Sequence, residues 1–418
     1  MTHTKRALPQ PPEEALKVIQ GLHAAGHEAW LVGGCVRDGC IGRPVGDYDI
    51  TTSALPEQVI EAFERTIPTG LQHGTVTVLV NAEPVEVTTY RVEGGYTDGR
   101  RPDEIAFTSQ LEEDLQRRDF TVNAMAWDPV SETLVDPYGG LEDLDRRRIR
   151  AVGRAIDRLT EDGLRSMRAV RFASVLDFEI EASTWQAIPD TLDTFAKVSV
   201  ERIQVELAKI LKGPFPSRGL QLLVDSGLLA AFLPELVAAD GHLEAFAALD
   251  EAPQVLEVRL AVMLSPLGSK AGQALDHLKF SNTIRKRVQH LLRWQSLDWA
   301  LSIPADVRRV TSELIAAAGD ESVVDDALSV HRVLSRPGAD AVDAFGGRVD
   351  ATQARKGPHR SRELALDGKA VMTLLGIPPS RRVGEILDRM MLRVWADPTL
   401  NTVEGLTGLL PELNAELE

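Results

Sequence analysis

The sequence predicts an α/β domain at the start of the chain and helices from there to its end. Short runs rich in β-branched residues occur only before about Leu141, and after it apolar residues recur at helical spacing. Aromatic residues make up only 5% of the chain, so the core is expected to rest on Leu, Val, Ile and Ala, as helical layers do. A chain of 418 residues is also long enough for roughly two to four domains.

The first domain is expected to combine one helix with a mixed sheet. Residues 13–26 carry apolar side chains at helical spacing and end in Gly26, a common helix stop. Four β-rich runs follow, at residues 28–34, 47–53, 75–80 and 85–91. The turn at 81–84 joins the last two runs closely enough for an antiparallel hairpin, which makes the sheet mixed.

Helical periods fill the rest of the chain. No further run has strand character, and Pro and Gly pairs between the periodic segments are typical of helix connections. The helical segments include residues 161–175, 200–211, 219–229 and 256–264, and they continue to Leu410.

Charge and cysteine content exclude several classes of protein. Lys and Arg number 46 against 62 Asp and Glu, a net charge of −16, which argues against nonspecific coating of nucleic acid and leaves only local basic patches. Cys35 and Cys40 are too close for a disulfide framework and too few for a structural zinc site.

Residues 1–12 lack the apolar core of a signal peptide, and no stretch approaches the roughly 18 apolar residues of a membrane span. We therefore expect a soluble, cytoplasmic protein.

Two features near the start of the predicted sheet point to phosphate chemistry. Residues 31–38 (LVGGCVRD) predict a strand, a glycine turn and a helix start, where backbone N–H groups can meet a phosphate, although such a turn is often only a tight connection. Asp47 and Asp49 stand two apart on a predicted strand, so both carboxylates face the same side. Two like charges held together call for a divalent cation, and hard oxygen ligands suit Mg²⁺.

The string GGCVRDGCIGRPVGDYDITTS at residues 33–53 resembles motif A of the polymerase-beta-like nucleotidyltransferases. It is most similar to the family of class II tRNA nucleotidyltransferases and bacterial poly(A) polymerases. Further segments resemble this family in order: the second strand pair at 72–76 and 86–91, motif B at 117–124 (RRDFTVNA), motif C at 136–144, motif D at 161–172 (EDGLRSMRAVRF) and motif E at 201–207.

The resemblance implies a fold and a domain order. We expect an α/β nucleotidyltransferase head with a polymerase-beta-like mixed sheet, followed by an all-α neck, body and tail. The expected boundaries are 1–145 for the catalytic head, 146–212 for the neck that selects the nucleotide base, 213–300 for the body, and 301–418 for a tail that binds tRNA.

The resemblance also implies an activity, namely the template-independent, Mg²⁺-dependent addition of CMP and AMP from CTP and ATP to the 3′ acceptor end of tRNA. An enzyme that adds only the terminal adenosine and a poly(A) polymerase remain alternatives, because the family shares motifs A to E. A non-enzymatic alternative is an inactive tRNA-binding protein, which would not need the aspartate pair. No membrane and no obligate protein partner is expected.

The site residues follow from the same motifs. Asp47 and Asp49 are expected to be catalytic and to bind the metal, and Glu86 is a candidate third carboxylate, with a cross-strand structural role beside Arg91 equally supported. The expected nucleotide-binding residues are Gly33, Gly34, Arg37, Arg118, Asp162, Arg165, Arg168 and Arg171.

The base is expected to be read by Asp162 and Arg165. They stand three apart on a predicted helix, hence on one face, where Asp accepts and Arg donates hydrogen bonds to the edge of a base. An intrahelical salt bridge is the alternative reading. Arg168 and Arg171 continue along the helix and would suit the base or the triphosphate.

A glycine-rich segment follows the predicted strands, and residues 93–110 are predicted to form a mobile loop that contains Arg100, Arg101 and Asp103. It resembles the family's flexible loop, which helps to change the site from CTP to ATP.

Local charge predicts where tRNA binds. Residues 146–171 hold nine arginines against three acidic residues, a local net charge of +6. Smaller patches are found at Arg285, Lys286, Arg287, Arg293, Lys369, Arg381 and Arg382, although each cluster alone is often only a solvated face.

Overall fold

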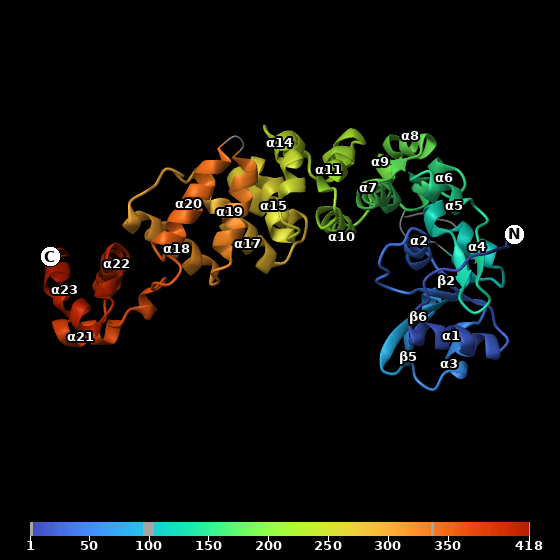
Figure 1. The fold of residues 1–418 in the computed structure, drawn as a ribbon, viewed down its shortest axis with the longest axis horizontal. Coiled ribbons are helices and arrows are strands. Elements are labelled where there is room, and N and C mark those ends of the chain that lie inside the picture. Colours follow the sequence, from blue (N-terminus) through green and yellow to red (C-terminus); the bar gives the residue numbers. More distant parts are fainter. Residues whose placement is uncertain (1–2, 95–103, 336–337, 418) are drawn as a thin grey trace. The chain divides into compact units, whose positions relative to one another are not determined.

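The computed structural model describes residues 3–94, 104–335 and 338–417 (Figure 1). The chain divides into two compact units, Met1–Val237 and Ala238–Glu418. The boundaries expected at 145, 212 and 300 are finer than this division and stay predictions.

Unit 1 is built on an eight-stranded mixed sheet with the strand order β1-β10-β9-β2-β3-β6-β5-β4. Strands β3 and β6 are parallel, and every other neighbouring pair is antiparallel. The strands are β1 (His3–Lys5), β2 (Ala29–Val32), β3 (Ile50–Thr52), β4 (Thr66–Gly70), β5 (Thr75–Val80), β6 (Glu83–Thr89), β9 (Ala126–Asp128) and β10 (Thr133–Val135). The predicted mixed sheet is confirmed. The sequence missed β1, β9 and β10, which are too short to show a period, and β4, which contains a proline.

The two faces of this sheet have different neighbours. Helices α1 (Glu13–Ala24) and α3 (Pro56–Ala62) cover the face to which β6 turns its buried valines (Figure 1). Because side chains alternate along a strand, the residues between those valines point to the other face. There Thr51 of β3 donates a hydrogen bond to Asp114 of helix α4 (Leu111–Gln116) at 3.3 Å.

The remaining elements of unit 1 are mainly helical. They are α2 (Gly34–Cys40), α5 (Gly140–Asp145), α6 (Ala155–Glu161), α7 (Leu164–Leu176), α8 (Ala182–Asp190), α9 (Leu192–Phe195), α10 (Val200–Leu211), α11 (Pro216–Asp225), α12 (Leu228–Phe232) and α13 (Pro234–Val237). Strands β7 (Arg91–Gly94) and β8 (Glu104–Phe107) form an antiparallel pair, and β11 (Arg148–Ile149) pairs in parallel with β12 (Glu179–Ile180). The prediction of no strand beyond Leu141 was therefore wrong, because two-residue strands leave no periodic pattern.

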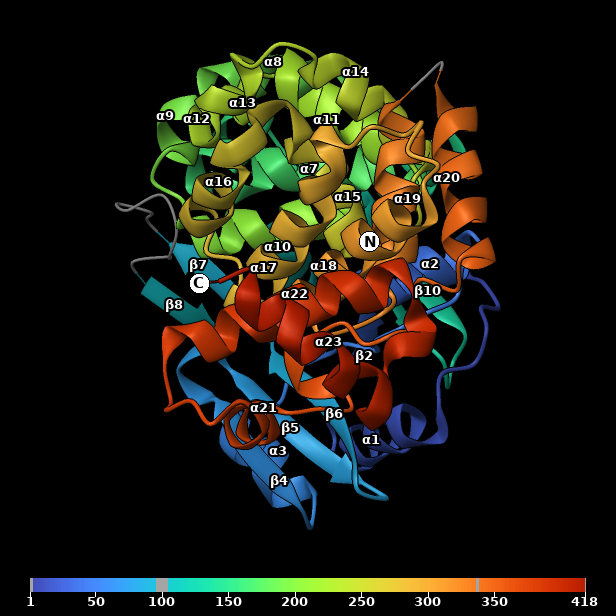
Figure 2. The same cartoon turned by 90° about the vertical axis from the view of Figure 1, so that its left-hand side faces the viewer.

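In the described residues of unit 2, all regular secondary structure is helical. Its helices are α14 (His242–Ala247), α15 (Leu256–Leu264), α16 (Ala271–His277), α17 (Asn282–Leu292), α18 (Pro304–Ala318), α19 (Val323–Leu334), α20 (Ala339–Ala351), α21 (Gly368–Leu375), α22 (Arg381–Ala396) and α23 (Val403–Ala415). Helices α21, α22 and α23 lie together and share one apolar cluster (Figure 2). Within the described residues, no helix is long and apolar enough to cross a membrane.

Candidate active site

The glycine turn after β2 is formed as predicted. The backbone of Gly33 has φ 78° and ψ −127°, a conformation that a side chain strongly disfavours, and α2 begins at the next residue. A Cβ atom at Gly33 would lie 3.2 Å from Nη1 of Arg118. Glycine at this position therefore lets the chain turn sharply while the guanidinium of Arg118 approaches the backbone.

The two aspartates of motif A precede β3 rather than lie on it. Residues 43–49 form no regular structure, and β3 begins at Ile50. The backbone of Asp49 nevertheless continues the ladder, since its carbonyl accepts a hydrogen bond from the N–H of Val32 at 3.0 Å. The prediction that Asp47 and Asp49 share one strand face was thus wrong for Asp47, because Pro44 and Gly46 keep the approach to the strand irregular. Both aspartates are exposed.

Glu86 of β6 lies one residue before Val87, the partner of Ile50 at the start of β3. The parallel strands pair Ile50 with Val87, so the register one residue earlier sets Asp49 opposite Glu86. Asp49 lies two residues before Thr51, and Glu86 lies two residues before Thr88, the partner of Thr51. Because side chains alternate along a strand, both carboxylates lie on the same face as Thr51. Glu86 is exposed, whereas the flanking Val85 and Val87 are buried. The sheet therefore supports an exposed carboxylate next to Asp49.

The pKa of Asp49 is set mainly by burial and by two neighbouring charges. Partial burial raises its pKa above the ordinary value, and the nearby negative charge of Asp47 raises it further, while Arg118 opposes both. The Cys35 thiol close by has its pKa raised to about 11, first by burial and then by Asp49. Cys35 therefore stays a neutral, packed thiol.

Arg118 is oriented by a carboxylate that the sequence did not single out. Asp114 is fully buried and forms ion pairs with Arg117 at 2.9 Å and with Arg118 at 3.3 Å. Burial opposes ionisation of Asp114, but the charges of Arg118 and Arg117 outweigh it and hold its pKa below the ordinary value. The sequence signal was available in the spacing, since the three residues lie three and four apart across a helix end.

The expected nucleotide-binding Arg37 is held by other side chains. It is buried, and its Nη1 donates to Oδ1 of Asn123 at 2.6 Å, while Nε and Nη2 donate to Asp38 at 3.0 and 2.9 Å. Asn123 in turn donates to Oδ1 of Asp119 at 3.0 Å. Arg37 thus joins helix α2 to motif B.

Arg168 and Arg171 of α7 are paired with buried carboxylates. Arg168 contacts Asp119 through Nε at 2.7 Å and Nη2 at 2.6 Å, and Arg171 forms an ion pair with Glu206 of α10. Despite burial, Arg168 and Asn123 hold the pKa of Asp119 well below its usual range.

The aromatic ring of Phe172 lies among these arginines. The guanidinium carbons of Arg37, Arg168 and Arg171 lie 5.1, 5.4 and 3.8 Å from the centroid of its ring. Cation–π contacts therefore join α2 to α7.

The predicted single helix over residues 161–175 is broken at the residues meant to read the base. Helix α6 ends at Glu161, Asp162 has extended backbone, and α7 begins at Leu164. At Gly163 a Cβ atom would lie 2.7 Å from the backbone of Phe195, so only glycine fits between the two helices. The prediction that Asp162 and Arg165 lie on one helix was therefore wrong.

Asp162 and Arg165 also take different partners. The carboxylate of Asp162 accepts two hydrogen bonds from Arg202 of α10, at 3.1 and 2.7 Å. Arg165 forms an ion pair with Glu161 and donates to the carbonyls of Arg158 at 2.9 Å and Arg117 at 3.1 Å. Motif E was recognised from sequence, but its Arg202 and Glu206 were not assigned to the site.

An open cavity of about 560 Å³ lies beside Arg202. It is lined by Leu164, Ser199, Glu201, Arg202, Val205 and Glu206. The start of α7 and the first turns of α10 thus border a space next to the partner of Asp162.

The arginines of the predicted basic patch over residues 146–171 are paired with carboxylates. All nine arginines form ion pairs with carboxylates, namely Arg146 with Glu142, Arg147 with Asp177, Arg148 and Arg150 with Asp143, Arg154 with Asp157, Arg158 and Arg165 with Glu161, Arg168 with Asp119, and Arg171 with Glu206. Most of these carboxylates lie outside the segment, so its local sum of +6 overstated the exposed charge.

The basic residues predicted in unit 2 are partly neutralised too. Arg285 pairs with Asp276 at 2.7 Å, Arg287 with Asp326 at 2.5 Å, and Arg381 with Glu385 at 2.9 Å. Arg382 donates to the carbonyl of Asn414 at 2.9 Å. Among the described residues, Lys286, Arg293 and Lys369 form no ion pair.

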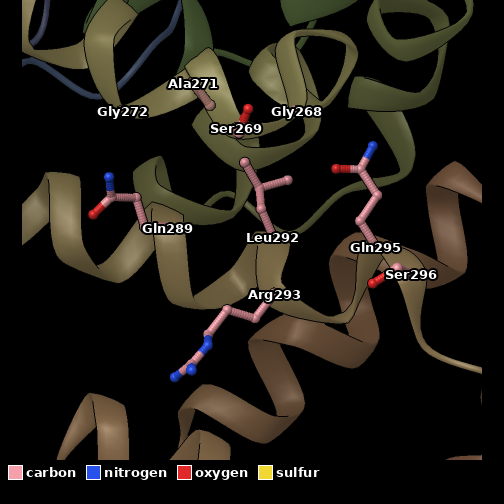
Figure 3. A pocket seen from close by; sticks show the side chains of 9 residues that line it. All are labelled: Gly268, Ser269, Ala271, Gly272, Gln289, Leu292, Arg293, Gln295 and Ser296. Atoms are coloured by element: carbon pink, nitrogen blue, oxygen red, sulfur yellow. The ribbon is translucent and has the colours of Figure 1, made fainter.

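Arg293 borders an open cavity of about 530 Å³ within unit 2 (Figure 3). Figure 3 shows Gln289, Leu292 and Arg293 on one side of this cavity, opposite the turn that contains Gly268 and Ser269. The loop residues Arg100, Arg101 and Asp103 lie outside the described residues.

Two family models match the chain. Residues 29–150 match the model described as the Poly A polymerase head domain, and residues 177–240 match the model described as the probable RNA and SrmB-binding site of polymerase A. The first match contains the motif A aspartates, Glu86 and Arg118.

The chain is similar to curated proteins over its whole length. It is 39% identical to the CCA-adding enzyme of Geobacillus stearothermophilus over an alignment of 424 positions, which covers 98% of this chain and 99% of the relative. It is 34% identical to the CCA-adding enzyme of Limosilactobacillus reuteri strain DSM 20016 over 420 residues, with 98% and 99% covered.

Solved structures also match nearly the whole length of the chain. The crystal structure of the Bacillus stearothermophilus CCA-adding enzyme in complex with CTP superposes with a TM-score of 0.80 and 35% identity, covering 98% of this chain and 99% of that one. The Thermotoga maritima CCA-adding enzyme complexed with tRNA shares the fold, with a TM-score of 0.66 at 18% identity over 97% of this chain and 95% of that one. The predicted order of an α/β head and a helical remainder is confirmed.

Proposed function

The chain belongs to the family of CCA-adding enzymes, which are tRNA nucleotidyltransferases, and we propose that Asp47, Asp49 and Glu86 form the centre where it transfers CMP and AMP from CTP and ATP to the 3′ end of tRNA. The observation that supports this proposal is the register of the parallel strands, which pairs Ile50 with Val87 and, continued by one residue, brings Asp49 opposite the exposed Glu86.

The donor set near Asp49 fits Mg²⁺. Asp47 and Asp49 offer two carboxylates close enough for the charge of Asp47 to raise the pKa of Asp49, after the larger effect of burial, and a cation would neutralise that repulsion. Within residues 3–94, 104–335 and 338–417, no three His, Cys, Asp or Glu side chains gather into a group that could hold a metal ion alone. Mg²⁺ commonly binds one or two carboxylates together with substrate phosphates. When bound, it would stabilise the charge that develops on the transferring phosphoryl group.

The remaining groups of the centre act on the triphosphate and on the RNA. Gly33 has no side chain of its own at the start of α2, and backbone N–H groups at a helix start attract phosphate oxygens. Arg118, held by Asp114 and adjacent to Gly33, supplies positive charge next to Asp49. In this proposal, the carboxylate of Glu86 accepts the proton of the attacking 3′-hydroxyl.

Residues of the neck, around helices α6, α7 and α10, determine which base is selected. Asp162 accepts hydrogen bonds, and cytosine and adenine both present an exocyclic amino group that donates them. Arg165 is anchored between Glu161 and the carbonyl of Arg117, so it fixes the start of α7 against motif B. Arg37, Arg168 and Arg171 keep α2, α7 and α10 in one arrangement around Phe172.

Substitution of the aspartates tests the centre. Asp47→Ala and Asp49→Ala should abolish incorporation of both nucleotides and leave tRNA affinity nearly unchanged, because they remove phosphoryl-transfer chemistry rather than contacts with RNA. The measurement is labelled CTP and ATP incorporation, with filter binding of tRNA in parallel. Glu57→Ala, an exposed carboxylate on α3, is the matched control. Normal turnover in either aspartate variant would refute the proposed centre.

The choice of acceptor distinguishes the related activities. Transcripts that lack CCA, CA or only A should all be completed and then stop, as a CCA-adding enzyme requires. Extension of the last transcript alone would indicate an enzyme that adds only adenosine, and continued addition of adenosines would indicate a poly(A) polymerase. We also propose a cytoplasmic location, because the substrate is tRNA and both described cysteines are free thiols.

A further inference from the structure

We propose that Arg202 is the positioning residue that makes Asp162 selective for the amino group shared by cytosine and adenine. The inference rests on the proposed role of Asp162 as the reader of the base. It adds a residue from α10 that sets how many hydrogen bonds this carboxylate can still accept.

The contacts of Asp162 fill most of its acceptor sites. Oδ1 accepts from Nη1 of Arg202 at 3.1 Å and from the N–H of Leu164 at 3.1 Å, and Oδ2 accepts from Nη2 of Arg202 at 2.7 Å. A carboxylate has about four lone-pair sites, so these contacts leave one, on Oδ2. The planar fork of the guanidinium also fixes the plane of the carboxylate, since both of its terminal nitrogens are engaged.

A fixed carboxylate with one open acceptor site discriminates among the four bases. Cytosine and adenine present amino groups, N4 and N6, that donate to it, whereas uracil and guanine present carbonyl oxygens at the same edge. Two acceptors facing each other in a partly buried site leave both without a donor, and they repel. A mobile carboxylate with free lone pairs could instead turn aside or bind a water that donates to a carbonyl. Arg202 removes that freedom.

The surroundings of Arg202 favour this role over that of a surface ion pair. The side chains of Arg202 and Asp162 are 27% and 15% exposed, so the pair is shielded from most solvent. Arg202 lines the cavity of about 560 Å³ that opens beside the start of α7. One turn further along α10, Glu206 holds Arg171 of α7, so the helix that carries Arg202 is fixed to the helix that follows Asp162.

Nucleotides without the amino group test the proposal directly. The triphosphates of 2-pyrimidinone riboside and purine riboside match CTP and ATP but lack the exocyclic amine. The wild-type enzyme should use each of them roughly tenfold to a hundredfold less efficiently than its parent, the range expected for a hydrogen bond to a charged group. In Arg202→Gln this penalty should shrink to a few-fold, and UTP and GTP should gain relative to CTP and ATP. Arg202→Lys, which keeps a positive charge and a donating nitrogen but loses the planar fork, should restore part of the selectivity.

A matched ion pair elsewhere in unit 1 controls for general disturbance. Arg218 contacts Asp177 and Glu179, each at 2.6 Å, and it is similarly exposed, so Arg218→Gln removes a comparable interaction without touching Asp162. This variant should keep the wild-type ratios of kcat/KM for all six nucleotides.

The outcomes separate this inference from the proposed function. If Arg202→Gln lowers kcat/KM for all nucleotides by the same factor, Arg202 is only structural and the inference is refuted. If Asp162→Asn also leaves every ratio unchanged, then Asp162 does not read the base and that part of the proposed function fails as well. If Asp162→Asn changes the ratios while Arg202→Gln does not, only the role of Arg202 is lost.

Discussion

The carboxylate of Asp119 and the guanidinium of Arg168 meet across motifs B and D, with Oδ2 of Asp119 2.7 Å from Nε and 2.6 Å from Nη2 of Arg168. Oδ1 of the same carboxylate accepts from the amide of Asn123, which also binds Arg37. One buried carboxylate therefore connects the glycine turn of the head to the first long helix that follows it.

This pair predicts a large loss of stability when only one partner is removed. Arg168→Ala should lower the free energy of unfolding by about 3–5 kcal/mol, because Asp119 would remain as a buried charge without its cation. Adding Asp119→Asn to Arg168→Ala should recover part of the loss, since the uncompensated charge is then gone. Denaturant titration measures both variants. Arg146→Ala breaks an exposed pair with Glu142 and should cost about 0–1 kcal/mol. Equal losses in Arg168→Ala and Arg146→Ala would show that the buried pair contributes nothing special.

Gly33→Ala should impair nucleotide incorporation more than its effect on stability explains. The new methyl group would lie 3.2 Å from Nη1 of Arg118 and would displace the guanidinium from the turn. Backbone strain adds a cost of about 1–3 kcal/mol. Gly26→Ala is a suitable control, since Gly26 also has positive φ but nothing lies within 4 Å of its Cβ position. Steady-state rates and melting temperatures should be compared at saturating CTP. If both variants keep the same rate, Gly33 acts only as a turn residue.

The raised pKa of Asp49 predicts the acid limit of activity. Metal binding requires the ionised carboxylate, so activity should fall on acidification at a higher pH than an ordinary aspartate would allow. Arg118 lowers this pKa, and Arg118→Gln should therefore move the acid limb of the normalised pH–rate profile to higher pH. Arg65→Gln, at an exposed cation just before β4, should leave the limb in place. A limb that stays unchanged in Arg118→Gln, or moves to lower pH, would contradict the assignment.

The segment from Gly95 to Asp103 lies outside the described residues, and its role stays a prediction from the family resemblance. Deleting it should spare the addition of two cytidines and suppress the addition of adenosine, because the loop is expected to reshape a shared pocket rather than supply chemistry. Product lengths on a transcript lacking CCA measure both steps in one reaction. Equal loss of both nucleotides would mean that the segment has a general role.

The sequence by itself determined the features that depend on neighbours in the chain. The helix at residues 13–24, the glycine turn at Gly33, the hairpin of β5 and β6, and the helical remainder all follow from local spacing and turn residues. The motifs also located the aspartates of the proposed centre and Glu86, since each lies within a short recognisable string.

Only the tertiary structure decided which charges meet. Asp162 binds Arg202, 40 positions away, and Arg168 binds Asp119, 49 positions away, so spacing within motif D gave no sign of either pair. The close approach of Gly163 to the backbone of Phe195 is likewise a contact that no local pattern encodes. The nine arginines of residues 146–171 look like a free basic patch because their carboxylate partners come mostly from other segments. Ion pairs form between groups that the fold brings close, and one sequence alone does not record that proximity.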